Sequence, residues 1–255
     1  MPLVTVEATR LRVDHAMKFV VGVVAAVLGS AWIFIHAWFP DYSHRFRLTV
    51  EINTPAGVQS GSSVIQATRV DRSYLPLPGR SYEIKVRGEA IFVDLGAGRN
   101  VIAVLGFGPR GDNVDQVGLV AINAWHFGDS IVSWKTIGAQ KGQADLAGNL
   151  IPAFVTFSDP SDPKSARLVC VPKSRDAVDY ASGPRCDPVG GIAAAEVVFG
   201  ENVTLRAARI EITSDPVTRT IGAKLPWLPH PDYLSGRFAC GPNEPHCLYG
   251  GHFTR

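Results

Sequence analysis

The chain has 255 residues, with 25 Lys and Arg against 23 Asp and Glu, so its formal net charge is only +2. Residues 1–40 hold three of the basic and two of the acidic residues, which leaves 22 and 21 for the rest. No basic run stands out, and this argues against a nucleic-acid partner, because nucleic-acid binders gather Lys and Arg on one face. The 25 Gly and 18 Pro are typical of short strands and many turns.

An apolar run without any charged residue extends from Phe19 to Phe39. As a helix it would span roughly 31 Å, which matches the hydrocarbon core of a bilayer. Trp32 and Trp38 lie toward its far end, where aromatic rings favour the membrane interface, and Pro40 ends the helix. The run is longer than the apolar part of a signal peptide, and no good cleavage site follows it. We therefore expect an uncleaved transmembrane anchor, with a buried core helix as the alternative.

The charges beside the run set its expected orientation. Arg10, Arg12 and Lys18 precede it, whereas Arg45 and Arg47 follow it. This bias favours a cytoplasmic N-terminus. The expected organisation is a cytoplasmic tail over 1–18, an anchor over 19–39 in a bacterial inner membrane and a periplasmic β-rich domain over 41–255.

Four cysteines all lie in the part expected outside the membrane: Cys170, Cys186, Cys240 and Cys247. An even number of cysteines in an oxidising compartment favours disulfides. Closeness in sequence favours the pairs Cys170–Cys186 and Cys240–Cys247, although the sequence alone allows three pairings.

The first half of the domain reads as strands joined by turns. In Phe46–Ile52, apolar and polar residues alternate, which is the pattern of a half-buried strand. Residues 82–86 alternate again, and further strands are predicted over the extended run 62–70, over 90–95 and over the continuously apolar residues 101–105. The short links between these five strands predict an antiparallel meander.

The second half mixes helices and strands. Helical periodicity over 114–127 predicts a helix, with a second short one near 130–137. Strands are expected over 150–157 and 204–213, a helical turn over 192–199, and a short helix from Pro216 to Lys224. Residues 172–191 and the last thirty residues are expected to lie on the surface. The predicted fold class is α+β: a transmembrane helix, then a mostly antiparallel β-rich domain with a few short helices.

Three segments carry a resemblance: FRLTVEINTPAGVQSGSSVI (46–65), GEAIFVDLGAGRNVIAVL (88–105) and RIEITSDPVTRTIGAKLPWL (209–228). Together they resemble uncharacterised single-pass envelope proteins of alphaproteobacteria. The resemblance implies a bacterial source and an envelope location. It transfers no catalytic residues, because the group has no established activity.

Two motifs hint at enzymatic chemistry. Gly106–Gly111 matches G-x-G-x-x-G after a strand, but Pro109 removes a backbone donor and the preceding strands form hairpins, so a glycine turn is the simpler interpretation. Ser60–Ser63 could hold a nucleophile. Its candidate bases and orienting carboxylates are His126, His230, Asp94 and Asp129. No spacing ties these residues together, and the pattern is not G-x-S-x-G.

Metal sites find weak support. The C-terminal part gathers His230, Cys240, His246, Cys247 and His252, but without the cysteine spacing of a zinc knuckle, so a small disulfide loop is favoured. Two carboxylates, Asp159 and Asp162, flank prolines and are too few to hold calcium. No cofactor is expected.

Aromatic residues suggest two binding surfaces. Trp125, His126 and Trp134 could line a ligand pocket, although core packing of the two tryptophans is the simpler interpretation. Trp227 and Leu228, between two prolines, could form an exposed patch for a protein partner or the membrane, or plug the core.

Two functions remain as expectations. The first is a non-enzymatic envelope protein, anchored by residues 19–39, whose outer domain binds another protein or stabilises a membrane complex. The alternative is a membrane-tethered hydrolase with an unrecognised Ser/His site. A carrier of a small apolar ligand is a third interpretation and requires an enclosed cavity.

Overall fold

The computed structural model describes residues 17–30, 32, 33, 41–72, 81–108, 110–173, 192–200, 202–229, 237, 238 and 248–255. Tyr42–Arg69 and Ile84–Arg255 belong to one compact unit, and the described residues of Met1–Asp41 and Val70–Glu83 to another. The first of these units holds the sheets and both cores.

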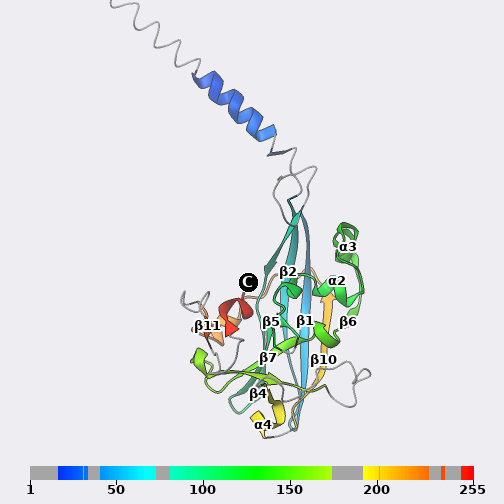
Figure 1. Ribbon diagram of the computed structural model, residues 1–255, viewed down its shortest axis with the longest axis vertical. Coiled ribbons are helices and arrows are strands. Elements are labelled where there is room, and N and C mark those ends of the chain that lie inside the picture. The colour runs from blue at the N-terminus through cyan, green and yellow to red at the C-terminus, as the bar shows by residue number, and fades with distance from the viewer. Residues whose placement is uncertain are drawn as a thin grey trace, which may run out of the picture. The chain divides into compact units, whose positions relative to one another are not determined.

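Two five-stranded sheets dominate the fold (Figure 1). The first has the order β3-β2-β1-β10-β6, with β1 Tyr42–Thr54, β2 Gly57–Asp71, β3 Tyr82–Arg87, β6 Gln143–Asp145 and β10 Thr204–Ile212. The second has the order β4-β5-β7-β8-β9, with β4 Ile91–Gly96, β5 Arg99–Phe107, β7 Pro152–Phe157, β8 Ala166–Cys170 and β9 Ala193–Ala194. A two-stranded sheet pairs β11, Arg237–Phe238, with β12, Leu248–Tyr249. β1 pairs antiparallel with β2 and β10, β10 with β6, β5 with β4 and β7, β7 with β8 and β11 with β12, whereas β8 and β9 pair in parallel. The predicted α+β class with mostly antiparallel sheets is confirmed.

The predicted five-strand meander is wrong, because the chain changes sheets after β3. β1, β2 and β3 stay together, while β4 and β5 pair with each other and β5 pairs next with β7. Gly88 lies at the crossing with φ +159°, and a Cβ there would come within 2.8 Å of the Ile65 side chain. The close approach of the two chain segments therefore favours glycine at this position.

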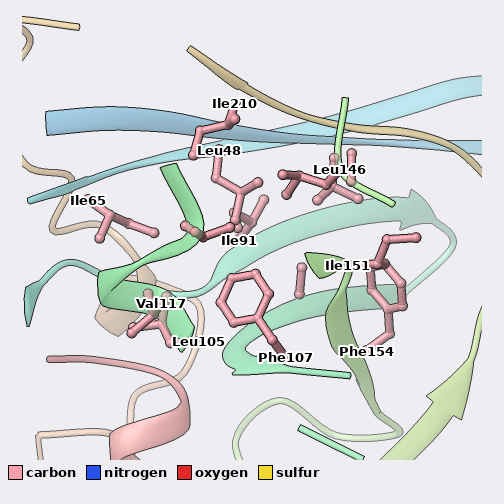
Figure 2. Packing of buried hydrophobic residues seen from close by; sticks show 14 of the residues in the cluster. Leu48, Ile65, Ile91, Leu105, Phe107, Val117, Leu146, Ile151, Phe154 and Ile210 are labelled. Atoms are coloured by element: carbon pink, nitrogen blue, oxygen red, sulfur yellow. The ribbon is translucent and has the colours of Figure 1, made fainter. Parts of the chain in front are cut away.

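Two hydrophobic cores lie on opposite faces of the second sheet. Val101, Ala103 and Leu105 of β5 belong to the first core, whereas Ile102 and Val104 belong to the second. This is why Val101–Leu105 is continuously apolar in the sequence: alternate side chains enter different cores. The first core joins the two sheets, and Figure 2 shows its side chains from both.

A bulge in β10 shifts the face on which its residues lie. Glu51 of β1 opposes Ala207, but Ile52 opposes Leu205, so Arg206 is the extra residue. The shift places Leu205 in the first core together with Ala208 and Ile210. Regular alternation would place Leu205 and Ala208 on opposite faces of the strand, but the alternation stops at the bulge.

The helices are short. They are η1 Asp115–Gly118, α2 Val120–Ala124, α3 Ile131–Thr136, η2 Ile137–Ala139, η3 Gly148–Leu150, η4 Pro163–Ser165, α4 Ala195–Phe199, η6 Ile221–Ala223 and η7 Gly250–His252. The helix expected over 114–127 is divided into η1 and α2, with Gly118 packed against the Ile84 side chain near the division. The helices near 130–137 and 192–199 are confirmed as α3 and α4.

The helix expected from Pro216 to Lys224 is wrong over its first half. Thr218 is bound to β2 instead: its backbone N–H donates to the Val64 carbonyl at 3.1 Å, and its hydroxyl accepts from the Val64 N–H at 2.8 Å. Pairing with a strand holds this segment extended, and only Ile221–Ala223 forms a helical turn.

The N-terminal apolar run is helical over 17–30, 32 and 33. Its large apolar side chains are exposed, from 47% at Val23 to 73% at Phe19. None of the helices in the described residues has the length and hydropathy needed to cross a membrane. Residues 31 and 34–39 of the expected anchor lie outside the described part of the chain, so the anchor over 19–39 stays a prediction.

Candidate functional site

The predicted nucleophile segment lies in β2, and its serines face different ways. Ser63 is opposite Leu48 and only 1% exposed, whereas Ser62 is opposite Thr49 and exposed. Within the described part of the chain, the Ser63 hydroxyl has no hydrogen-bond partner. A buried hydroxyl without a base offers no activated nucleophile.

The predicted bases do not meet these serines. His126 is exposed, with φ +58°, and His230 lies outside the described residues. Asp94 accepts the Gly96 N–H at 2.8 Å and so stabilises a turn. His44 faces the same core as Ser63, but it lies opposite Ala67, four strand positions or about 13 Å away. Among the described residues, no hydrogen bond joins a serine to a histidine.

The glycine motif forms a tight turn at the end of β5. A Cβ on Gly106 would overlap the backbone carbonyl of Gly111, and the Gly108 N–H donates to the Ile151 carbonyl at 3.1 Å. Both neighbours of β5 in its sheet, β4 and β7, are antiparallel to it. The strand–turn–helix unit with a parallel partner strand, which a dinucleotide site requires, is not formed here.

The candidate metal residues are mostly outside the described part of the chain, including His230, Cys240, His246 and Cys247. Within the described part, no group of three or more His, Cys, Asp or Glu is placed to hold a metal ion. His252 is buried, and its Nδ1 accepts the Tyr249 N–H at 3.2 Å. Burial lowers the pKa of His252, with a further lowering by the Arg255 charge.

Of the four cysteines, only Cys170 lies within the described residues. Cys170, at the end of β8, is disulfide-bonded. Cys186, Cys240 and Cys247 lie outside the described residues, so the pairs Cys170–Cys186 and Cys240–Cys247 stay predictions.

The carboxylates of Asp159 and Asp162 shape local turns. Asp159 Oδ1 accepts the Ser161 N–H at 2.8 Å, and Asp162 Oδ1 accepts the Lys164 N–H at 2.9 Å. Asp162 thereby caps η4. Both carboxylates therefore stabilise local turns of this loop.

Of the two interpretations left open for Trp227 and Leu228, the structure has the buried plug and not the exposed patch. These residues are only 7% and 4% exposed and belong to the second core. Trp227 Nε1–H donates to the Pro160 carbonyl at 3.0 Å, and the indole packs edge-on against Phe253. The apolar residues between the two prolines cover the outer face of the second sheet, which is the plug considered as the alternative.

A polar cluster at the start of β1 was not foreseen. We call it the α3 cluster; it comprises Tyr42, His44, Arg69, Asp129, Trp134 and Lys135. Its strand residues follow from register, because Tyr42 opposes Arg69 on β2 and His44 is in phase with Phe46, which faces the core. The signal was available in part, since His44 extends the alternation of Phe46–Ile52 by one step. Its helical partners could not be inferred from that pattern.

Asp129 and Trp134 hold α3 against the first sheet. Ser130 caps α3 by accepting the Ser133 N–H, and this places Trp134 inward at 2% exposure. Trp134 Nε1–H donates to Asp129 Oδ1 at 3.0 Å, and the same oxygen accepts from Arg69 at 3.4 Å. Of the predicted pocket residues, Trp134 is therefore buried, Trp125 is partly buried against the first core and His126 is exposed.

His44 is the unusual member of the α3 cluster. It is 5% exposed, its ring centroid is 5.1 Å from that of Trp134, and neither ring nitrogen has a hydrogen-bond partner among the described residues. Burial lowers its pKa from 6.5 to about 4. Near neutral pH, His44 is therefore a neutral imidazole that packs against aromatic rings, and it is protonated only at low pH.

The outer face of the first sheet carries a ladder of ion pairs. Arg47 pairs with Glu211 at 3.1 Å and with Asp215, and Arg209 pairs with Glu51 and Asp145, both at 3.0 Å. The side chains are partly exposed, and the two signs alternate across β1, β10 and β6. We call this surface the charged face. It offers an ordered polar surface rather than a catalytic arrangement.

Comparison with protein-family models, with curated proteins and with solved structures finds no significant match. The function must therefore be argued from the residues of this chain.

Proposed function

We propose that this chain is a single-pass protein of the bacterial inner membrane whose periplasmic domain is a non-enzymatic module that binds another protein or stabilises a membrane complex. Residues 19–39 are the anchor in this proposal, residues 1–18 the cytoplasmic tail and residues 41–255 the periplasmic domain. The disulfide-bonded Cys170 in that domain fits an oxidising compartment.

The observation that carries the proposal is the exposure of the N-terminal apolar helix. Every described large side chain from Met17 to Ile33 in this helix is at least 47% exposed. Full burial of one such side chain is worth about 1.5–3 kcal/mol, so the helix gains strongly from an apolar environment. A bilayer supplies that environment around the whole circumference, which suits a helix that is apolar on all sides.

The charged face supports the binding part of the proposal. Its ion pairs fix long side chains across β1, β10 and β6, so that a partner meets a preformed arrangement of both signs. Charge patterns of this kind select a partner more than they add affinity. A protein with a complementary mixed pattern is the expected ligand.

The test uses the full-length tagged chain in bacterial membranes. We expect it to stay in the membrane fraction after alkaline carbonate extraction, whereas a variant with Val23→Lys and Val27→Lys should be released, because a charge costs about 2.5–3.5 kcal/mol at the centre of a membrane helix. Val197→Lys, at an exposed position of α4, is the matched control and should stay bound. Retention of the double variant would contradict the anchor.

The binding part is tested by capture in mild detergent with quantitative mass spectrometry. We expect a stoichiometric partner that is lost on Arg209→Glu and retained on Lys141→Glu, an exposed position outside the charged face. Absence of any partner, together with labelling of Ser62 or Ser63 by a serine-reactive fluorophosphonate, would favour the hydrolase instead.

A further inference from the structure

Helix α3 presents two apolar side chains away from the domain. Ile131 is 39% and Val132 64% exposed. In the compact unit that holds the sheets, the described large apolar side chains with comparable exposure are few: Val58, Ile131, Val132 and Val197. Two of them are neighbours on one short helix, which makes α3 the place where exposed apolar surface is concentrated.

The buried side of α3 is held in place by hydrogen bonds, so the helix cannot rotate and Ile131 and Val132 stay exposed. Ser133 and Trp134 are buried, the Ser133 hydroxyl donates to the Gly128 carbonyl at 2.5 Å, and Trp134 is bound to Asp129. Lys135 follows Ile131 by four residues and Val132 by three, so these three side chains share one helical face. The α3 face, as we call it, thus combines two apolar side chains with one cation.

The short chain segment between the proposed anchor and β1 indicates which surface the α3 face can contact. This step rests on the proposed function, in which the anchor ends at Phe39. Tyr42 follows three residues later, and three residues of chain span at most about 11 Å. The Lys135 ammonium lies 5.5 Å from the centre of the Tyr42 ring. The start of β1 and the cation beside it are therefore held within reach of the bilayer surface.

We propose that the α3 face is a lipid contact: Ile131 and Val132 enter the interfacial region of the periplasmic leaflet, and Lys135 binds the phosphate of an anionic headgroup. Apolar side chains beside a cation are the composition that favours a lipid surface. Because the anchor already holds the domain at the membrane, binding of the α3 face to lipid is effectively intramolecular. A small face is then enough for this contact, although the same face could not hold an untethered protein on a membrane.

The experiment places a photoreactive p-benzoylphenylalanine at Val132 in the full-length chain. The protein is reconstituted into vesicles of phosphatidylcholine with phosphatidylglycerol and irradiated, and lipid adducts are measured by mass spectrometry. The matched control carries the same group at Val58, which is 45% exposed but pairs with Asn53 at the far end of β1, about 36 Å of strand from Tyr42.

We expect lipid adducts at position 132 and none above background at position 58. Lys135→Glu should lower the adduct at 132 about fivefold, because one basic residue near an anionic surface is worth about 1 kcal/mol. Vesicles of phosphatidylcholine alone should give a similar loss.

The outcomes separate this inference from the function it rests on. A chain that floats with the vesicles but labels lipid equally at 132 and 58 overturns the lipid contact and leaves the anchor in place. A chain that does not float overturns the anchor as well. In native membranes, an adduct of position 132 with a protein instead of lipid also overturns the lipid contact.

Discussion

The imidazole of His44 packs against the indole of Trp134, with ring centroids 5.1 Å apart and no hydrogen-bond partner for either imidazole nitrogen among the described residues. The two residues come from β1 and α3, so the contact joins a strand to the helix that covers it. A proton on His44 would introduce a buried charge at this contact. The ring contacts of His44 are with Phe46 and Trp134, neither of which carries a charge that would stabilise the proton.

The first prediction concerns pH. The pKa of His44 is about 4 in the folded protein, below its ordinary value of 6.5, because burial disfavours the charged ring. Between these values the unfolded chain binds more protons, so the free energy of unfolding decreases as pH falls from 6.5 toward 4. The full contribution of His44 is about 3 kcal/mol, present above pH 6.5 and lost by pH 4. Thermal unfolding of the full chain in detergent across this range measures it.

His44→Leu is the variant that isolates this effect. It keeps the buried volume and removes the titrating group, so its stability should vary less with pH than that of the native chain. The native His252 stays in both proteins, and since its pKa is also lowered, its contribution cancels in the comparison. If the free energy of unfolding varies with pH in the same way for both proteins, then protonation of His44 does not destabilise the folded protein.

The second prediction concerns Glu89, a carboxylate only 5% exposed. It accepts hydrogen bonds from the Thr220 N–H at 2.7 Å, the Thr220 hydroxyl at 2.9 Å and the Ile221 N–H at 3.1 Å. Glu89→Gln would turn an amide donor toward these donors and should cost about 1–3 kcal/mol. The melting temperature should fall by about 2–4 °C per kcal/mol.

An exposed glutamate provides the comparison. Glu196 lies on the solvent side of α4, and Glu196→Gln should leave the melting temperature nearly unchanged. If both variants have the melting temperature of the native protein, then the hydrogen bonds of Glu89 do not stabilise the segment at the start of η6.

The third prediction follows from the burial of Trp227. Because this indole is buried among Phe157 and Phe253, Trp227→Ala should destabilise the protein by about 3–5 kcal/mol. Trp227→Phe keeps a ring but removes the hydrogen bond to Pro160, and should cost about 1 kcal/mol. An exposed docking residue would behave differently: Trp227→Ala would then weaken partner capture at unchanged melting temperature.

The strands were predictable where one face is buried and the other is not. Phe46–Ile52 alternates because β1 has the first core on one side and the charged face on the other, and the observed strand extends this pattern to Tyr42–Thr54. Sheet membership was not predictable, because alternation says nothing about which strand lies alongside. The bulge at Arg206 was hidden for a similar reason: it is defined by the pairing with Glu51 and Ile52, more than 150 residues earlier in the chain.

The contacts within the α3 cluster were also not predictable from the sequence. Sequence reasoning considered Trp134 and Asp129 separately, one as a core residue and one as a carboxylate for a histidine. The approach of Trp134 to His44 on β1, and that of Asp129 to Arg69 on β2, depend on the fold of the intervening strands. The sequence left the exposure of Trp227 open because flanking prolines indicate only a turn, whereas its burial is decided by contacts with Phe157 and Phe253.

The last prediction tests whether the glycine motif is structural. At Gly106 a Cβ would overlap the backbone carbonyl of Gly111, and backbone atoms cannot move aside as a flexible side chain can. Gly106→Ala should therefore destabilise the protein by about 1–3 kcal/mol. Gly138 lies in η2 with no atom within 4 Å of its added Cβ, so Gly138→Ala should change stability by less than about 1 kcal/mol. Equal melting temperatures for the two variants would contradict the tight turn, whereas a selective loss at Gly106 would assign the motif to the close approach of two chain segments and not to a bound phosphate.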